Sequence, residues 1–288
     1  MFEQLAVIGC GLMGGSFALA LKRAGLVRRV VGYSKSPTTT ERARQMGVID
    51  VEAPSALLAV SGSDLVLLAV PVAATEATLK AIRHLVRRDM LVMDVGSTKR
   101  EIVDAARRVL QADVGAFVPC HPMAGREVAG VEHADPDLYT GRQVILTPIE
   151  RTLVAQLDRA EQVWTALGCR VVKMSPEAHD AACAAVSHLP HLLAYALMDS
   201  IASQRQAEQF LGLAGPGFRD FTRIAASDAK VWRDILLSNR VEIQAQLGHL
   251  RESLARFEAL VAASDGPALE ALIERASQAR SNWRLGGH

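Results

Sequence analysis

The chain has 288 residues, half of them hydrophobic and 22% charged, with a formal net charge of +1 at pH 7. Its length suits one large or two medium domains, and its balanced charge gives no electrostatic case for binding nucleic acid or an anionic membrane. No apolar run approaches the ~18 residues that a membrane-spanning helix needs, and the N-terminus lacks a signal-peptide pattern. Four scattered cysteines without a Cys-x-x-Cys pair favour a reducing compartment and argue against structural zinc or disulfides. We therefore expect a cytoplasmic protein with no nucleic-acid or membrane partner.

The first predicted strand covers residues 4–9 and runs into the pattern G-x-G-x-x-G, which begins at residue 9. A helix is expected to end near residue 24, and a second strand is expected at 29–33. In this setting the glycines permit a tight turn, a close approach to a pyrophosphate and close helix–strand packing, while the helix start offers free N–H groups to the phosphates. The pattern predicts dinucleotide binding; the alternative is a glycine-rich turn without a ligand. The turn residues expected to contact the coenzyme are Gly9, Gly11, Leu12, Met13 and Gly14.

The second predicted strand ends without the acidic residue that commonly binds the ribose hydroxyls of NAD. From residue 33 the chain reads Tyr-Ser-Lys-Ser-Pro-Thr-Thr, so hydroxyls and a lysine are available to a 2′-phosphate and no carboxylate repels it. We expect NADP to be favoured, with NAD bound through weaker contacts at a solvated polar turn as the alternative. The residues expected at this end of the coenzyme are Ser34, Lys35, Ser36 and Thr39.

Further strands are predicted at 65–70 and 91–95, with an amphipathic helix at 73–87 between them. Val70 and Pro71 end one strand where dinucleotide domains commonly pass the cofactor. Ser97 follows the next strand at the start of another helix, so it can be a helix N-cap, a substrate contact or both. Strands at 143–147 and 170–173, around a helix at 151–167, are expected to extend the same sheet.

His121 lies between Pro119 and Pro122, after a strand-like run. Each proline biases the residue before it towards extended geometry, and Gly125 then allows a sharp turn. An imidazole held on a stiff loop after a strand suits a catalytic base. Ligands gather beyond the carboxyl ends of parallel strands, where Ser97 and His121 could converge. The alternative is a histidine that only caps or packs.

The pattern changes at residue 175, where Ser-Pro-Glu predicts a helix start. Helical periodicity runs to about residue 209, and no strand-like alternation follows. We therefore expect an α/β Rossmann-type dinucleotide-binding domain at 1–174 followed by an all-α domain at 175–288, with substrate in the crevice between them. The helix predicted at 241–263 has an apolar stripe broad enough to bury against a second chain, so a homodimer is expected.

A second cluster of candidate site residues lies in the helical part. His188 and His191 share roughly one face of the long helix, beside a proline expected to kink it. Substrate contact and packing are equal alternatives for His188, and contact is favoured for His191; no zinc-ligand partners are evident at suitable spacing. Arg219 and Arg223 are a like-charged i,i+4 pair, which an anion would relieve. A guanidinium binds a carboxylate in bidentate fashion, and Asp220 can orient one of the two, although a solvated basic face is the alternative.

Together these segments resemble the prephenate/arogenate dehydrogenase family of tyrosine biosynthesis. The resemblance is carried by Gly-Cys-Gly-Leu-Met-Gly-Gly-Ser, Asp-Val-Gly-Ser-Thr-Lys, His-Pro-Met-Ala-Gly-Arg-Glu, Ser-His-Leu-Pro-His and Phe-Arg-Asp-Phe-Thr-Arg-Ile-Ala, in that order over nearly the whole chain. The first motif is shared by many dehydrogenases, whereas the other four together are specific. The resemblance implies a C-terminal dimerisation domain and oxidative decarboxylation of prephenate to 4-hydroxyphenylpyruvate, or of arogenate to tyrosine, with hydride transfer to NAD(P)+.

The resemblance also implies residue roles. It places the catalytic histidine on His121, the hydroxyl-contacting serine on Ser97 and the arginine that binds the ring carboxylate on Arg223. The second histidine of the helix pair would face the substrate side chain, and two acidic residues would belong to a charged network at the site entrance. The implied substrate-binding set is Arg223, His191, His188, Glu127 and Asp220. The alternatives are a β-hydroxyacid dehydrogenase, a pyrroline-carboxylate reductase or an NADPH-binding regulator without turnover.

Overall fold

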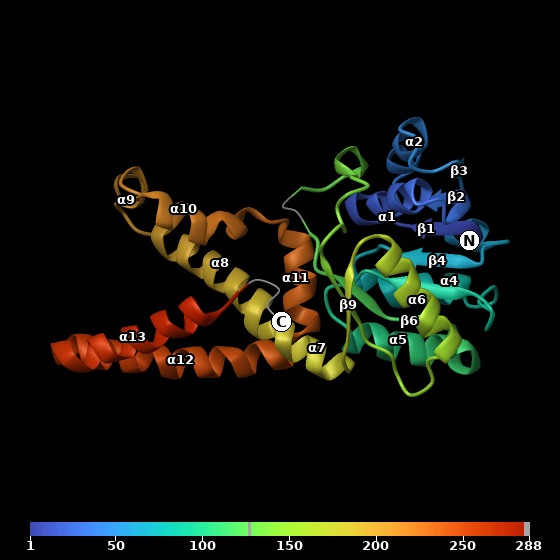
Figure 1. The fold of residues 1–288 in the computed structure, drawn as a ribbon. Helices are drawn as coiled ribbons and strands as arrows, with labels where there is room; N and C mark the ends of the chain where they lie inside the picture. The colour runs from blue at the N-terminus through green and yellow to red at the C-terminus, as the bar shows by residue number, and fades with distance from the viewer. Residues whose placement is uncertain (126–127, 285–288) are drawn as a thin grey trace. The chain divides into compact units, whose positions relative to one another are not determined.

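The computed structural model describes residues 1–125 and 128–284 (Figure 1). Its contacts divide the chain into two compact units, Met1–Asn239 and Arg240–His288. The change from alternating strands and helices to helices alone lies inside the first unit, at the helix that begins at Pro176.

A six-stranded parallel sheet forms the core of the first unit, in the order β3-β2-β1-β4-β5-β6. Short apolar runs form its central strands, whose residues are buried on both faces, as is usual in parallel sheets. Ile8 pairs with Tyr33 on one side and with Leu68 on the other, so the carboxyl ends of three strands meet at one edge. The strands are β1 (Phe2–Ile8), β2 (Val27–Tyr33), β3 (Val51–Glu52), β4 (Leu65–Leu68), β5 (Leu91–Asp94) and β6 (Phe117–Val118). This doubly wound order confirms the predicted Rossmann-type fold.

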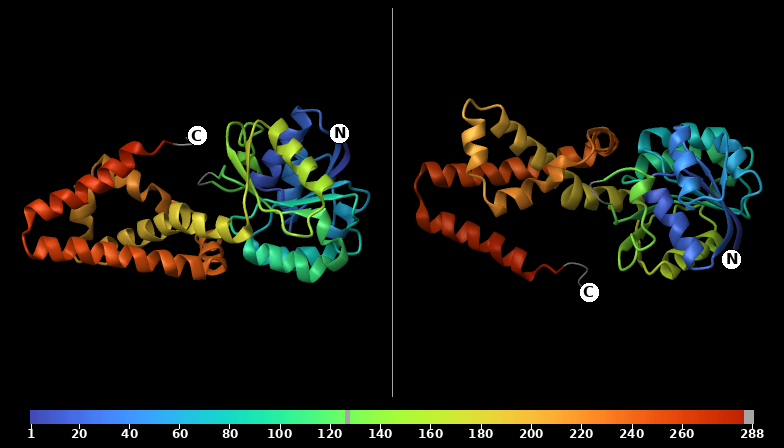
Figure 2. Two further views of the ribbon diagram at one scale, coloured as in Figure 1. Left: turned by 60° about the horizontal axis from the view of Figure 1, so that its bottom comes forward. Right: turned by 90° about the horizontal axis from the view of Figure 1, so that it is seen from above.

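Helices cover both faces of this sheet (Figures 1 and 2). Leu5 and Val7 of β1 pack in one apolar cluster and Ala6 and Ile8 in a second, because alternate strand residues point to opposite faces. The first cluster is closed by α1 (Leu12–Arg23) and α6 (Val154–Ala166), and α2 (Pro37–Gln45) adds Ala43 to it. The second cluster is closed by α3 (Ala56–Val60), α4 (Thr75–Ile82) and α5 (Arg100–Leu110).

The later strands do not extend the first sheet, as the sequence had led us to expect. β7 (Cys120–Pro122), β8 (Gln143–Leu146) and β9 (Arg170–Lys173) form a second sheet in the order β7-β8-β9, with β7 antiparallel to β8. Pro119 stands between β6 and β7 and has no N–H to donate to a ladder, so the chain leaves the first sheet there. His121 therefore lies within a strand, opposite Ile145, and not on the predicted loop.

The helical segment of the first unit starts where the sequence predicts. Ser175 accepts a hydrogen bond from the N–H of Ala178 (3.1 Å) at the start of α7 (Pro176–Cys183). A π-helical turn, Ala184–His188, joins α7 to α8 (Leu189–Ala202). Pro190 interrupts the helical hydrogen bonds in the predicted place, and the wider turn before it accommodates the interruption. The chain then forms α9 (Ala207–Gly212), α10 (Pro216–Thr222), a 3₁₀ turn at Arg223–Ala226 and α11 (Ala229–Ser238).

By length and composition alone, the helical stretch Pro176–Ala202 could cross a membrane. Polar residues are spread between the apolar ones of this stretch, so it is not one uninterrupted apolar run. Two of them, His179 and Asp180, are fully buried and hydrogen-bonded within the first unit. These contacts make the start of this helix part of a folded core.

The second unit consists of α12 (Arg240–Ala262) and α13 (Gly266–Asn282), which are joined by a short turn (Figure 2). Asp265 begins α13 by accepting a hydrogen bond from the N–H of Ala268 at 3.0 Å. Several large apolar side chains on the two helices are exposed, namely Val241, Leu254, Val261 and Ile273. These residues lie on surfaces that a single copy of the chain leaves uncovered.

Candidate active site

A buried ion pair ties the end of β5 to the strand that carries His121. The Asp94 carboxylate accepts hydrogen bonds from the N–H groups of Gly96 (2.8 Å) and Cys120 (2.9 Å). Lys99 Nζ pairs with the same carboxylate at 2.5 Å and also donates to the carbonyl of Cys120 at 2.6 Å. Both charges are removed from water, and the additional hydrogen bonds offset part of the cost of this desolvation. The turn after β5 and the start of β7 are thereby held together.

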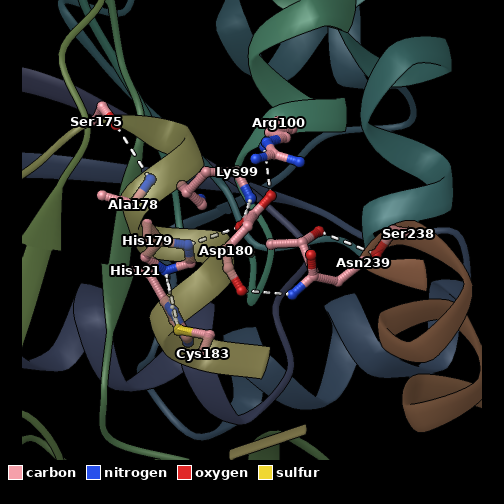
Figure 3. Close-up of polar contacts among 12 residues, drawn as sticks. Lys99, Arg100, His121, Ser175, Ala178, His179, Asp180, Cys183, Ser238 and Asn239 are labelled. Carbon is pink, nitrogen blue, oxygen red and sulfur yellow. Dashed lines mark hydrogen bonds and ion pairs between the residues drawn. The ribbon is translucent and has the colours of Figure 1, made fainter. Parts of the chain in front are cut away.

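Asp180 of α7 caps the neighbouring helix α5 (Figure 3). Its Oδ1 accepts from the N–H of Lys99 (2.8 Å), and its Oδ2 accepts from the N–H of Arg100 (2.9 Å). A carboxylate at this position satisfies two N–H groups that the helix leaves unpaired and complements the positive end of the helix dipole. The N-cap residue and the first residue of α5 are thus fixed by a residue about 80 positions away.

Three side chains form a buried hydrogen-bonded chain that leads to the base candidate. Asp180 Oδ1 lies 2.8 Å from His179 Nδ1, and His179 Nε2 lies 2.8 Å from His121 Nδ1. Because the carboxylate only accepts, His179 carries its proton on Nδ1 and accepts at Nε2 from the Nδ1–H of His121. The remaining nitrogen of His121, Nε2, then carries a lone pair that can take up a proton. Cys183 Sγ lies beside the chain, 3.4 Å from His179 Nε2 and 3.9 Å from His121 Nδ1 (Figure 3).

The electrostatic surroundings keep the imidazoles neutral. Burial lowers the pKa of His121 well below its ordinary value, and repulsion from His179, Lys99 and His188 lowers it further. Burial also lowers the pKa of His179, although the hydrogen bond to Asp180 opposes this shift. For Asp180, burial alone would raise the pKa, but hydrogen bonds from His179 and two backbone N–H groups outweigh it and keep the carboxyl ionised. The chain thus presents an uncharged base backed by a carboxylate.

Ser97 lies half-buried in the bend between β5 and α5. The structure assigns the N-cap position of α5 to Lys99, and Asp180 supplies the capping hydrogen bonds. The alternative role of Ser97 as the helix N-cap was therefore wrong. Ser97 stays a candidate for substrate contact.

The two histidines predicted on one helix face have different surroundings. His188 is buried, and its Nδ1 lies 3.0 Å from Asn239 Nδ2, which also donates to the carbonyl of Asp180 at 2.8 Å. Burial is the main cause that lowers the pKa of His188 to about 4. His191 is half-buried and stacks on Trp232, with ring centroids 3.5 Å apart. Trp232 is itself only half-buried.

The charged residues predicted to bind substrate lie at the surface of the first unit. Arg223 is exposed in the 3₁₀ turn, which packs against α8. Asp220 is exposed in α10 and pairs with Arg219 at 3.3 Å. Glu127 lies outside the described residues.

The glycine-rich turn between β1 and α1 fits a dinucleotide. A Cβ on Gly9 (φ +100°) would lie 2.2 Å from the carbonyl oxygen of Ala69, and one on Gly14 would lie 2.0 Å from that of Gly9. A Cβ on Gly11, by contrast, would meet no atom of the described residues within 4 Å. Two glycines therefore serve the turn and the helix–strand packing, while Gly11 leaves room for a ligand to approach the backbone at the start of α1.

The other predicted coenzyme contacts lie along the carboxyl edge of the six-stranded sheet. Ser34 Oγ accepts a hydrogen bond from the N–H of Cys10 (2.8 Å), which ties the end of β2 to the glycine turn. Lys35 and Ser36 are exposed in the adjoining turn, and Thr39 is half-buried. The remaining predicted coenzyme contacts are Leu12 and Met13 at the start of α1 and Val70 and Pro71 just after β4.

Comparison with known proteins agrees with this arrangement. The prephenate dehydrogenase nucleotide-binding domain model matches residues 17–173, and the prephenate dehydrogenase dimerization domain model matches residues 175–275. The chain belongs to the prephenate dehydrogenase family.

Named relatives and a solved structure match over most of the chain. It is 36% identical to the prephenate dehydrogenase of Bacillus subtilis over 84% of this chain and 66% of that protein, so it spans just under two thirds of that relative. It is 32% identical to the cyclohexadienyl dehydrogenase of Zymomonas mobilis over 97% of this chain and 96% of that one. The crystal structure of Aquifex aeolicus prephenate dehydrogenase, in complex with hydroxyphenyl propionate and NAD+, is 34% identical and superposes with a TM-score of 0.91 over 98% of both chains.

Sequence reasoning missed the residues that support His121 in this family member. His179 and Asp180 follow the predicted helix start, and a His-Asp pair in an otherwise apolar helix is a signal that could have been noticed. Lys99 ends the Asp-Val-Gly-Ser-Thr-Lys motif, but no neighbouring residue in the sequence indicates that this lysine is completely buried. The contacts of His179, Asp180 and Lys99 depend on the packing of α7 against α5, which no local sequence pattern shows.

Proposed function

We propose that this chain catalyses the oxidative decarboxylation of prephenate, with arogenate as the alternative substrate, and that His121 is its base. Membership of the family supports the reaction class and an NAD(P)-dependent dehydrogenase. The observation that carries the assignment of the base is the buried chain from Asp180 through His179 to His121. A neutral imidazole in a fixed tautomer is what removal of a hydroxyl proton requires.

In the proposed reaction the ring hydroxyl of the substrate gives its proton to Nε2 of His121. The carbon that bears the hydroxyl would lose hydride, and a dinucleotide bound at the glycine-rich turn would supply the hydride acceptor. The ring carboxylate then leaves as carbon dioxide, and the electrons of the broken carbon–carbon bond pass through the ring to the new carbonyl oxygen. That oxygen takes back the proton from His121, and aromatisation drives the step. As the proton arrives, positive charge develops on the imidazole, and the Asp180 carboxylate stabilises it through His179.

For substrate binding we propose the roles that the family resemblance implies. Ser97 would contact the ring hydroxyl, Arg223 the ring carboxylate and His191 the side chain of the substrate, with His188, Glu127 and Asp220 in the surrounding set. The exposed guanidinium of Arg223 offers two parallel hydrogen bonds to a carboxylate. An arginine that gripped the departing carboxylate most strongly in the ground state would slow its loss, so its contribution is expected mainly in KM.

For the coenzyme we propose NADP over NAD. The exposed Lys35 and Ser36 follow β2 in the place where a carboxylate would repel a 2′-phosphate. The ratio of kcat/KM for the two coenzymes tests this preference, and Lys35→Ala should lower kcat/KM for NADP more than for NAD. A strong preference for NAD in the unmodified protein would overturn it.

We further propose that two copies of the chain assemble through the C-terminal helices and that the protein acts in the cytoplasm. The dimerization-domain match and the exposed apolar residues of α12 and α13 support the first point. The four cysteines are all free thiols, which fits a reducing compartment. Light scattering of the purified protein at several concentrations would measure the assembly.

The deciding experiment is the rate of His121→Asn. With prephenate or arogenate and either coenzyme, absorbance of the reduced nicotinamide should show kcat lowered about 10²- to 10⁴-fold with little change in KM. His84→Asn, which alters an exposed histidine after α4, is the matched control and should keep wild-type kinetics. A folded His121→Asn protein with the kcat of the wild type would remove His121 from the proposed role.

A further inference from the structure

We propose that His121, His179 and Cys183 form a binding site for a single Zn²⁺ ion, and that this ion blocks the catalytic base. The inhibitory half of the proposal rests on the proposed function of His121, whereas the binding half stands on the three side chains alone. Their donor atoms all lie within 4.8 Å of one another, and all three residues are buried. Imidazole nitrogen and thiolate sulfur are the donors that Zn²⁺ prefers.

The distances in the cluster are close to those of a tetrahedral site. With Zn–N near 2.05 Å and Zn–S near 2.3 Å, tetrahedral geometry places nitrogen and sulfur about 3.6 Å apart and two nitrogens about 3.3 Å apart. Cys183 Sγ lies 3.4 Å from His179 Nε2 and 3.9 Å from His121 Nδ1. The two nitrogens, now hydrogen-bonded at 2.8 Å, must separate by about half an ångström. The imidazoles are on different elements, β7 and α7, so small ring rotations can supply this movement.

The surroundings of the cluster favour a metal in two ways. Asp180 accepts a hydrogen bond from Nδ1 of His179, and a carboxylate behind a ligating histidine fixes its orientation and increases its donor strength. The charges of the ion, the Cys183 thiolate and the Asp180 carboxylate cancel, since two positive charges meet two negative ones. Lys99, the nearby buried cation, is already paired with Asp94. The occupied site would therefore be neutral overall, whereas the empty site carries the single negative charge of Asp180.

The positions of the protons before and after binding show why an ion in this site would stop catalysis. His179 already presents a lone pair at Nε2 and keeps its proton on Nδ1, which donates to Asp180. His121 must move its proton from Nδ1 to Nε2 to free Nδ1 for the metal, and Cys183 must release its thiol proton to solvent. Binding therefore releases one proton in total. The Nε2 of His121 then carries a hydrogen instead of the lone pair that the proposed reaction needs.

Cobalt(II) provides a binding test that does not depend on activity. Metal-free protein titrated with Co²⁺ should develop thiolate-to-cobalt charge-transfer absorption and the visible bands of tetrahedral cobalt, saturating at one ion per chain, and Zn²⁺ should displace it. Cys183→Ser and Cys183→Ala should lose the charge-transfer band, with folding checked by circular dichroism. Cys169→Ser, which removes a buried thiol elsewhere in the core, should keep it. A band that survives both Cys183 substitutions would overturn the site.

Inhibition is then measured on the same proteins. Zn²⁺ should abolish turnover of the substrate, and a chelator should restore it. Cys183→Ser, compared with its own metal-free rate, should need roughly 10-fold more Zn²⁺ or more for half-inhibition, because even the loss of an outer partner typically weakens a metal site about 10–100-fold. Cys169→Ser should match the wild type. If Zn²⁺ bound as the cobalt spectra require but left the rate unchanged or raised it, the inhibitory proposal would be wrong. A protein without dehydrogenase activity would instead overturn the proposed function and leave the cobalt result intact.

Discussion

Replacing Asp180 by asparagine tests whether one carboxylate serves both the fold and the base. The carboxylate accepts three hydrogen bonds, two at Oδ1 from Lys99 N–H and His179 Nδ1 and one at Oδ2 from Arg100 N–H. An asparagine accepts the largest number of hydrogen bonds when its side-chain oxygen takes the place of Oδ1. Its NH₂ group then faces the N–H of Arg100, which is also a donor. That arrangement keeps the tautomer of His179 and loses the cap of one backbone donor.

The expected cost follows from these contacts. One buried N–H without an acceptor costs about 1–3 kcal/mol, and hydrogen bonds to a charged acceptor exceed neutral ones by about 1 kcal/mol each. The free energy of unfolding should therefore fall by roughly 2–4 kcal/mol in Asp180→Asn. Without a negative charge behind His179, the developing imidazolium on His121 is less stable. We expect kcat to fall about 10- to 100-fold with little change in KM.

Urea unfolding and initial rates measured on the same preparation separate the two effects. Asp104→Asn, on the exposed side of α5, is the control and should change the free energy of unfolding by no more than about 0.5 kcal/mol. Unchanged stability in Asp180→Asn would mean that the carboxylate does not cap α5. Lowered stability with the kcat of the wild type would show that the chain of side chains behind His121 has no part in turnover.

Three further predictions follow from single residues. Because the pKa of His188 is about 4 when folded and near 6.5 when unfolded, the unfolded chain binds the extra proton. The free energy of unfolding should then drop by about 3 kcal/mol from pH 6.5 to 4, and most of this drop should vanish in His188→Gln; equal urea curves for both proteins would refute it. Gly11→Ala should keep the melting temperature but weaken coenzyme binding, measured by calorimetry. In Gly14→Ala the added Cβ would clash with the backbone oxygen of Gly9, so the melting temperature should fall. The opposite result would contradict these roles of the two glycines. Arg223→Ala should mainly raise KM for prephenate, and an unchanged KM would assign the carboxylate to another residue.

Local patterns were sufficient to predict the nucleotide-binding half of the molecule. Buried parallel strands are continuous apolar runs, and a glycine turn between a strand and a helix has few other uses. The same patterns failed for strands β8 and β9, because an apolar run does not reveal which sheet it joins. Pro119 held the missing information, since it interrupts the ladder between β6 and β7. The same proline thus has two effects, because it also stiffens the segment that carries His121.

The candidate site was predictable only where a residue carries its own signal. Two prolines distinguish His121 in the sequence. Nothing comparable distinguishes Asp180, which acts on the start of α5 about 80 residues earlier in the chain. That contact exists only after α7 packs on α5, so it is a property of tertiary structure.

The negative charge of Asp180 and the positive charge of Lys99 both help to make His121 a neutral base in a fixed tautomer. A carboxylate behind an imidazole pair would by itself raise the proton affinity of both rings, and a base that is already protonated cannot accept the proton of a substrate. Burial and the nearby Lys99 shift the pKa of His121 in the other direction, so the ring stays neutral near pH 7 while Asp180 still fixes its tautomer through His179. Lys99 can have this influence without adding an unpaired charge because Asp94 neutralises it locally. Before the reaction His121 is therefore a neutral base. The Asp180 carboxylate stabilises the site most when His121 has taken up the proton and its ring is positively charged.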